Sequence, residues 1–404
     1  MSEFDKARHV LHRTSVPVFS RAEKIDTASR LLMSGDSPVQ PVLLRQYVQT
    51  QPMGKVILSH DDRDAFWREL CTDPRVVIIR NSSDTRTYHP FAGHSARQIQ
   101  QMLCALPEAQ NANADLKLLI RTFAQILELD ESLLEYVAEN GCTPDLLEER
   151  LDILLERRRL PEARYNMILR QVHSYTNAYP ELEVLLTGLP DFLTHSARSG
   201  LRAGHSLRSV IESGRSIVFV FDNDYNSASD FDRTLLSLVA SDMDLTLKNR
   251  TADFSLVIDD LPYLYIQPFL WAFHRPNGAC VLNLCSIADY PLNHRYAQLI
   301  RTCFDLYMVF AHNSQDMCQF WSDTFGPARI AEYSYGNTST NTTRYPMLSP
   351  VNQLFGLQQD AETVNYQYVD KNLYPSYTFR NLGLKEYFLY ERKFNRISQR
   401  LLSL

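Results

Sequence analysis

The stretch Phe254–Leu264, FSLVIDDLPYL, places two adjacent acids, Asp259 and Asp260, directly behind a run of apolar residues. A short, continuous apolar run is typical of a strand that is covered on both faces. Strands of that kind occur where helices pack on both sides of a parallel sheet. The stretch therefore predicts an inner strand that has a pair of carboxylates at its carboxyl end.

Similar apolar runs occur on either side of this stretch, at Lys55–Ser59, Arg75–Arg80, Arg215–Phe221, Ala279–Leu284 and Phe304–Phe310. Helical patterns separate the later runs, at Asp230–Leu247, Leu261–Phe273 and Asn293–Arg301. Strands that alternate with helices favour parallel order. The sequence therefore predicts an α/β protein with three layers and a mostly parallel sheet.

A long helical block interrupts this alternation. Apolar residues recur at helical spacing from about 100 to 207, and Thr143 followed by Pro144 marks a helix start inside the block. We therefore predict an all-α domain at 100–207, inserted between two parts of one α/β core at 51–99 and 208–404.

The two ends of the chain have weaker patterns. Residues 1–50 mix polar, apolar and proline residues, which predicts an irregular or weakly helical arm. Beyond Gly326 the chain is rich in Tyr, Thr and Asn, with a strand-like segment at Tyr366–Val369 and a final helix expected near Lys385–Leu402. We interpret this tail as an extension of the core.

Composition limits the class of protein. The formal net charge of −6 argues against broad, charge-driven binding of nucleic acid, although a local basic face is compatible with it. Seven cysteines are scattered without the spacing of metal ligands, so we interpret them as reduced core residues and expect no metal site. No stretch reaches the ~20 apolar residues of a membrane span, and the first residues do not form a secretory signal. A cytoplasmic location is expected.

The paired acids suggest two kinds of chemistry. An acid at the carboxyl end of a core strand can hold Mg²⁺ through water, and the acid after it can orient an attacking water. Two acids behind a strand also often begin a helix, and Asp260 before Leu261 and Pro262 is a suitable N-cap. The pair alone does not decide between these interpretations.

The elements around the acids give the pair a context. In chain order they are Gly214 with RSIVFVF, the long helix, the acid-capped strand, Arg275 and Gly278, the strand that runs to Cys285, Phe325-Gly326, YSYGNTSTNTTR and Leu348-Ser349-Pro350. This succession resembles the ATPase body of type IV coupling proteins, which serve conjugation and secretion. The resemblance implies a RecA-like core with an inserted all-α domain, and it covers roughly residues 55–390.

The sequence departs from that family where nucleotide would bind. No Gly-x-x-x-x-Gly-Lys-Ser/Thr motif occurs anywhere in the chain. After the strand at Lys55–Ser59, which we take as the first strand of the core, the expected phosphate-loop position contains Ser59, His60, Asp61, Asp62, Arg63 and Asp64. Aspartates without glycine repel a triphosphate, because a phosphate loop wraps the phosphates with backbone N–H groups and a lysine.

Two further positions differ from the family. The second acid of the pair is Asp260 where the family has Glu, and the family's strand-end Gln corresponds to Cys285. Arg275 is retained, and in ring-shaped ATPases such an arginine can complete a neighbouring subunit's site in trans. Local pairing with Asp259, or capping of a helix, is the other interpretation of Arg275. The sequence thus argues against ATP hydrolysis and predicts no bound cofactor.

Three functions are compatible with these residues. The favoured one is a non-catalytic, structural or adaptor component that binds other secretion or conjugation proteins, with DNA or protein cargo as a further partner. The second is a divergent ATPase or DNA translocase that binds ATP and Mg²⁺ without the usual lysine. The third is a DNA-handling protein whose energy comes from another subunit. Contact with the inner membrane is expected only through such partners.

Overall fold

The computed structural model describes the chain with gaps. The described residues are 14–15, 30–35, 37–38, 40–41, 43–44, 54–60, 76–79, 88–109, 111–130, 132–187, 206–222, 224, 226, 228–247, 254–274, 279–284, 302–339 and 360–401. They form two compact units, of which one comprises Met1–Ala311 with Gly383–Leu404 and the other comprises His312–Leu382.

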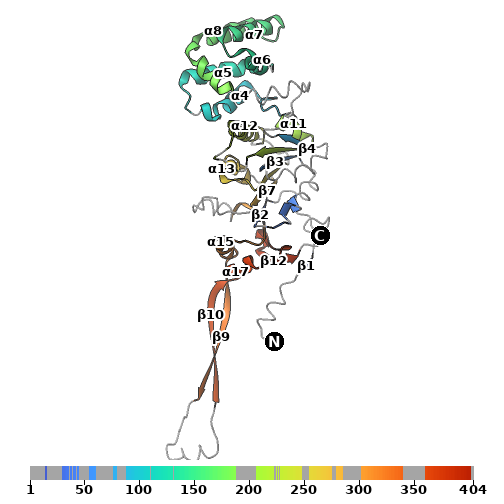
Figure 1. Cartoon of the computed structure of the whole chain (residues 1–404), viewed down its shortest axis with the longest axis vertical. Coiled ribbons are helices and arrows are strands. Elements are labelled where there is room, and N and C mark those ends of the chain that lie inside the picture. Colours follow the sequence, from blue (N-terminus) through green and yellow to red (C-terminus); the bar gives the residue numbers. More distant parts are fainter. Residues whose placement is uncertain are drawn as a thin grey trace, which may run out of the picture. The chain divides into compact units, whose positions relative to one another are not determined.

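The first unit is built on a ten-stranded sheet with the order β1-β12-β11-β8-β2-β7-β6-β3-β5-β4. Its central strands all pair in parallel, from β8 through to β4 (Figure 1). Their bounds are β2 Arg30–Ser34, β3 Lys55–His60, β4 Val76–Ile79, β5 Ser216–Phe221, β6 Ser255–Asp259, β7 Ala279–Leu284 and β8 Leu306–Val309. The predicted α/β fold with a mostly parallel sheet is confirmed.

The apolar runs form this sheet because they are covered on both faces. Every residue of β3, β5 and β6 is buried, and so are the described side chains of β7. Fully burying one Val, Leu or Ile side chain stabilises a fold by about 1.5–3 kcal/mol. Four of the five described cysteines are also buried, as predicted for small core residues: Cys142, Cys280, Cys303 and Cys318.

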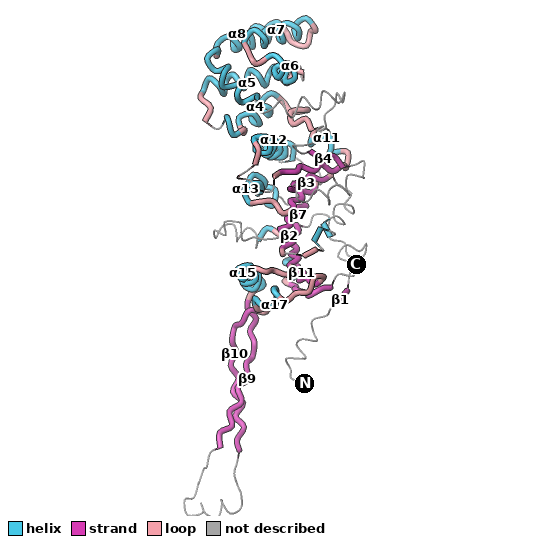
Figure 2. Tube along the Cα trace, viewed as in Figure 1, coloured by secondary structure: helices cyan, strands magenta, loops and turns pink. Residues whose placement is uncertain are grey.

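Helices lie beside this sheet. The predicted helix at Asp230–Leu247 is α12, with the same bounds, and the predicted helix at Leu261–Phe273 is observed as α13, Tyr263–Ile266, continued by the 3₁₀ helix η4, Gln267–His274. Figure 2 shows α12 and α13 next to the magenta strands. The short helix α11, Leu207–Glu212, precedes β5. The expected helix at 293–301 lies outside the described residues.

The expectation for residues 1–50 is wrong at Arg30–Ser34. This segment is the inner strand β2, which pairs in parallel with both β7 and β8. Its start is fixed by Arg30, whose guanidinium bonds both carboxyl oxygens of Asp305 at 3.1 Å and donates to the carbonyl of Phe273. The tiny strand β1, Thr14–Ser15, pairs with β12 at the sheet's edge.

The expected final helix near Lys385–Leu402 is also wrong. The segment forms an antiparallel hairpin of β11, Glu386–Glu391, and β12, Arg396–Leu401, joined by the 3₁₀ turn η6, Arg392–Phe394. Asn395 has φ 46° at the end of this turn, a conformation that Asn tolerates better than most residues. β11 pairs antiparallel with β8, which extends the parallel core.

The helical block is observed between residues 96 and 187. Its helices are α4 Ala96–Cys104, α5 Ala114–Leu127, α6 Leu133–Asn140, α7 Pro144–Glu156, α8 Glu162–Ser174 and α9 Tyr179–Thr187, with the 3₁₀ turns η2 Pro107–Ala109 and η3 Thr176–Ala178. The predicted start of α7 is confirmed, because the Thr143 hydroxyl accepts from the Leu146 N–H. The domain boundaries at 100 and 207 stay predictions.

The second unit, His312–Leu382, contains the helices α15, Gln315–Phe325, and α17, Ser376–Arg380. Phe325 and Phe379 pack with ring centroids 5.4 Å apart, and Trp321 is fully buried. A long two-stranded ribbon of β9, Pro327–Ser339, and β10, Asp360–Asn372, pairs antiparallel over thirteen positions of each strand. The predicted strand at Tyr366–Val369 is thus part of β10.

Candidate functional site

The candidate site lies at the carboxyl edge of the parallel sheet. Parallel strands end on the same side, so the last residues of β3, β6 and β7 meet there. In open α/β sheets, ligands bind outside this edge, where the crossover direction changes. The predicted acid pair, Asp259 and Asp260, is at the end of β6, between its neighbours β3 and β7.

Asp259 is locked into a buried network. Its side chain is 1% exposed, and it accepts a hydrogen bond from the Ser59 hydroxyl on β3 at 3.2 Å. On the other side the Asn283 amide of β7 donates to it at 2.8 Å. Buried carboxylates are stable only when neighbouring donors satisfy them. The network therefore joins the ends of three adjacent strands.

Asp260 has a different environment. Its φ is 53°, in the left-handed region, and its N–H donates to the carbonyl of Asn283 at 2.8 Å. Its carboxyl group is partly exposed and lies 3.9 Å from Nε2 of His60. Backbone strain of this kind often occurs at binding sites. Asp260 is thus the acid of the pair that solvent and ligands can reach.

The structure brings four of the predicted site residues together: Ser59, His60, Asp259 and Asp260. The other predicted positions, Asp61, Asp62, Arg63, Asp64, Arg275 and Cys285, lie outside the described residues. The polar partner of Asp259 on β7 is Asn283, which is not among the predicted site residues. An Asn inside the apolar run ACVLNL was the available signal.

The structure also corrects the premise of the phosphate-loop prediction. Lys55–Ser59 is not the first strand of the core, because β2 precedes it inside the sheet. The connection that leaves β2 runs toward β3, whereas the one that leaves β7 crosses to β8 on the other side of β2. The crossover direction therefore changes at β2, which makes the turn after Ser34 a second ligand-binding position at this edge.

The turn after β2 is held by the chain itself. Gly35 has φ 126°, and a Cβ there would lie 2.7 Å from the carbonyl oxygen of Ala311. Its N–H donates to the carbonyl of Leu284, and the Ser37 hydroxyl donates to the carbonyl of Leu384 at 2.9 Å. A helix follows at residues 40–41 and 43–44. The connection is therefore a strand, a glycine turn and a helix.

A second pair of acids lies at the end of β5. Asp232, in the first turn of α12, is 1% exposed, and burial together with the adjacent carboxyl group of Asp222 raises its pKa to about 7. Ser229 links the two acids, since its hydroxyl donates to Asp232 and its N–H donates to Asp222. β5 pairs with β3, so these acids belong to the same edge of the sheet.

A third buried acid, Asp242 of α12, joins the sheet to the helical block. It accepts from the hydroxyls of Tyr88 at 2.6 Å and Thr246 at 2.8 Å, and Nε2 of His94 lies 2.9 Å from it. Burial and this carboxylate raise the pKa of Tyr88 well above its ordinary value. Three donors thus satisfy Asp242, which gives it a structural role.

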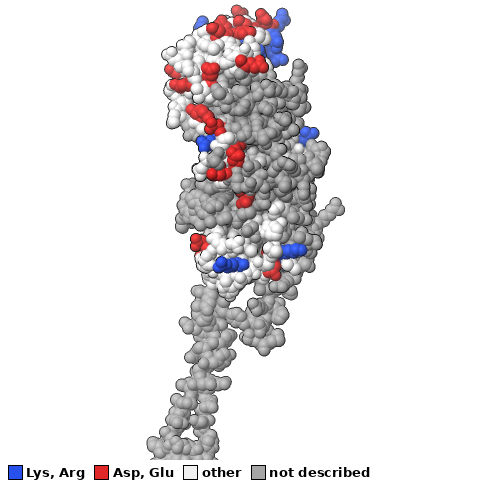
Figure 3. Space-filling view, in the orientation of Figure 1, with Lys and Arg blue, Asp and Glu red and all other residues white. Residues whose placement is uncertain are grey.

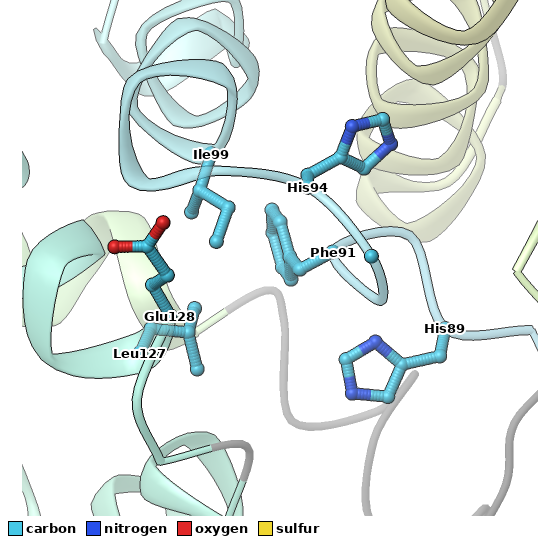
Figure 4. Close-up of a pocket in the computed structure, with 7 residues that line it drawn as sticks. His89, Phe91, His94, Ile99, Leu127 and Glu128 are labelled. Carbon is cyan, nitrogen blue, oxygen red and sulfur yellow. The ribbon is translucent and has the colours of Figure 1, made fainter. Parts of the chain in front are cut away.

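A small cavity of about 140 Å³ opens beside this joint. Figure 4 shows His89, Phe91 and His94 on the loop before α4, facing Leu127, the last residue of α5, and Glu128, which follows it. The His94 imidazole turns toward α12, where it meets Asp242. The cavity accordingly belongs to the packing between loop and helices, and we assign it no chemistry.

No three His, Cys, Asp or Glu side chains among the described residues are placed to hold a metal ion. No helix in the described part of the chain is long and apolar enough to cross a membrane.

Known proteins provide a comparison for the fold. No family model and no curated protein matches the sequence. Solved structures do match, beginning with the bacterial conjugative coupling protein TrwBdeltaN70 in its unbound monoclinic form, at a TM-score of 0.55 and 13% identity over 99% of this chain and 91% of that one.

Two further TrwB structures match over 100% of this chain and 92% of theirs. One is the complex with the GTP analogue GDPNP, at a TM-score of 0.53 and 12% identity, and the other is the complex with ADP and Mg²⁺, at 0.51 and 14%. At such identity the likeness concerns the fold alone. The predicted RecA-like α/β core is confirmed on this basis, and the chain has the fold of the conjugative coupling protein TrwB.

Proposed function

We propose that this chain is a non-catalytic component of a type IV secretion or conjugation system, with an ATPase-derived fold that serves for binding other components. The main support for the proposal is that neither of the two turns at the carboxyl edge, after β2 and after β3, has the groups that bind a triphosphate. The proposal assigns the chain to the coupling-protein family on the shared fold and on the order of its elements.

The turn after β2 supports this proposal. Residues 34–41 read SGDSPVQP, with one glycine, one acid, two prolines and no lysine. A phosphate loop needs successive backbone N–H donors and a lysine, and a proline has no N–H to donate. The turn after β3 is no better, since residues 59–64 contain three aspartates and no glycine. Both positions favour repulsion of a triphosphate.

The network around Asp259 supports it as well. In an active site of this class the strand-end acid holds Mg²⁺ through water. Here Ser59 and Asn283 each donate to one of its two oxygens, and its side chain is almost fully buried. We infer that Asp259 maintains the strand edge and binds no metal.

The helical block supports a protein partner over nucleic acid. Residues 96–187 contain fifteen acidic and nine basic residues, and acidic side chains gather over this block in Figure 3. A surface of that charge repels phosphate backbones, whereas it attracts basic protein segments. We therefore propose that the block binds a basic segment of a secretion or conjugation protein.

Calorimetric titration of the full chain with Mg-ATP and Mg-ADP, with the same excess of free Mg²⁺ in the cell and the syringe, tests the central claim. We expect no saturable heat up to millimolar nucleotide and no phosphate release. Saturable binding in the micromolar range would overturn the proposal, and it would favour the divergent ATPase. Asp260→Ala then identifies the site, because only a nucleotide at this edge depends on that partly exposed carboxylate.

Arg275 carries a separate part of the proposal, namely that it completes the nucleotide site of a partner ATPase in trans. The test is the ATP turnover of the partner that co-purifies with this chain. We expect Arg275→Ala to lower that turnover by roughly 10³-fold or more, the magnitude of a lost arginine finger. Unchanged turnover with the complex intact would assign Arg275 to local pairing.

A further inference from the structure

The connection between β5 and α12 has an unusual run of oxygen-bearing side chains. Residues 222–232 read DNDYNSASDFD. Asp222, Asp224 and Asn226 stand at alternate positions, the spacing with which calcium-binding loops begin. The later positions differ from such loops, since Ser227 replaces the glycine and Arg233 stands where a bidentate Glu occurs. The pattern alone therefore suggests a cation but does not establish a site.

The folded loop brings two of the acids together. Ser229 and the backbone of Asp222 connect the carboxyl groups of Asp222 and Asp232. The N–H of Asp222 reaches one oxygen of Asp232 at 3.4 Å, and the Ser229 hydroxyl donates to the same oxygen at 3.1 Å. The N–H of Ser229 reaches Asp222 at 3.3 Å. The loop thus holds two carboxyl groups of like charge, those of Asp222 and Asp232, close together.

The second oxygen of Asp232 gives evidence for a bound species that is independent of the residue spacing. Oδ1 is buried and has no hydrogen-bond partner, in a side chain that is 1% exposed. Buried polar atoms nearly always have a partner, so an exception requires a bound species or a functional reason. Asp222 is only half-buried, which leaves the pair open to solvent from its side.

No cationic side chain of the described residues relieves this pair. The nearest in sequence, Arg233, directs its guanidinium to the carbonyl of Asn226 at 3.5 Å and makes no ion pair with either acid. Two facing carboxylates of which one is buried need a proton or a metal ion between them. The loop supplies further oxygen ligands for a metal ion, namely the Ser229 hydroxyl and the exposed side-chain amide of Asn226.

We propose that the β5–α12 loop binds a hard divalent cation, Ca²⁺ or Mg²⁺, between the carboxylates of Asp222 and Asp232. Hard cations take oxygen ligands from carboxylates, amides, hydroxyls, backbone carbonyls and water. Such a site needs no third acid, which agrees with the absence of a trio of acidic, His or Cys side chains among the described residues. The all-oxygen ligand set disfavours zinc, which prefers nitrogen and sulfur.

The site is separate from the nucleotide question, because it needs no phosphate and lies at the end of β5. The test is calorimetric titration of the chelator-stripped full chain with CaCl₂ and, in a second arm, with MgCl₂. We expect one saturable site with Kd on the order of 10⁻⁵–10⁻³ M for at least one of the two ions, the range of weaker loop sites. The arm that saturates identifies the ion.

Two variants make the test specific. Asp232→Asn keeps an oxygen for Ser229 but removes the charge, and we expect it to weaken binding at least tenfold. The matched control is Asp316→Asn, an exposed first-turn acid on α15, which should bind as the unmodified chain does. The absence of saturable heat with either ion would overturn the proposal. Equal affinity in Asp232→Asn would overturn it too, since the ion would then sit elsewhere.

Discussion

Helix α12 carries two buried aspartates that meet opposite surroundings. Asp242 accepts from two hydroxyls and an imidazole, whereas Asp232, ten residues earlier and about 15 Å away along the helix, faces the carboxyl group of Asp222. Both are 1% exposed, so burial alone does not set their roles. The difference shows that the neighbours of a buried carboxylate decide its role. Surrounded by hydrogen-bond donors, it has a structural role. Beside a second carboxyl group, it can take up a proton or bind a cation.

The largest expected effect is the loss of Asp242. Asp242→Ala removes the acceptor of Tyr88, His94 and Thr246 and leaves them buried without it, so we expect a loss of about 3–5 kcal/mol in unfolding free energy. Chemical denaturation monitored by circular dichroism measures it. Tyr88→Phe removes one bond and should lose only about 1–2 kcal/mol. A loss for Asp242→Ala no larger than that would contradict the three-donor description.

The next prediction compares how the stability of each of the two units depends on pH. Burial lowers the pKa of His312 to about 4 from an ordinary value of 6.5. Between pH 6.5 and 4, His312 is protonated in the unfolded chain but stays neutral in the folded unit. The contribution of His312 to the free energy of unfolding is therefore complete above pH 6.5 and is lost as the pH falls toward 4. The loss is roughly 3 kcal/mol at most.

Asp232 predicts the opposite sign, because its pKa is raised from 3.8 to about 7 and its protonated form stabilises the first unit at low pH. That stabilisation is complete below pH 3.8 and is lost as the pH rises toward 7. Hydrogen exchange measured peptide by peptide should therefore show α15 losing protection between pH 7 and 5 while α12 gains it. His312→Gln should abolish the change in α15 alone, and parallel changes in both helices would contradict the contrast.

The sequence predicted the parts of this fold whose signal is local. The β-branched runs of β3, β5 and β6 were identified nearly to the residue, because buried parallel strands need such runs. β2 was missed since Arg-Leu-Leu-Met-Ser lacks a β-branched residue and lies among prolines. The C-terminal hairpin was mistaken for a helix, because short apolar runs fit both periods.

The candidate site was predictable only in part for a related reason. Asp259 and Asp260 follow an apolar run, so their place at a strand end can be derived from the sequence. The contact of Asp259 with Asn283 and the turn after Ser34 depend on which strands are neighbours. Strand order arises from the packing of the whole sheet and is not encoded in the spacing of any one segment.

A smaller effect is expected at the facing acids. Asp232→Asn in chelator at pH 7.5 removes the repulsion with Asp222 while its amide oxygen still accepts from Ser229, so we expect a gain of about 1–3 kcal/mol in stability. Thermal unfolding detects it as a raised Tm. Asp230→Asn, at an exposed position of the same turn, should instead lose at most ~1 kcal/mol from its interaction with the helix dipole. A lowered Tm for Asp232→Asn would show that Asp232 needs its charge even without a cation.

The smallest effect is expected at Asp259, the buried acid of the candidate site, which can be compared with Asp232 and Asp242. Asp259→Asn preserves the shape and can still accept from Asn283 while donating to the Ser59 hydroxyl, so the stability should change by less than about 1 kcal/mol. Asp259→Ala leaves both partners buried without an acceptor and should lose about 2–3 kcal/mol. An acid that holds Mg²⁺ responds differently to this substitution, because the metal ion depends on its charge and not on its shape. If Asp259→Asn abolished binding of a partner complex or of nucleotide while leaving the fold intact, Asp259 would resemble the poised Asp232 and not the structural Asp242.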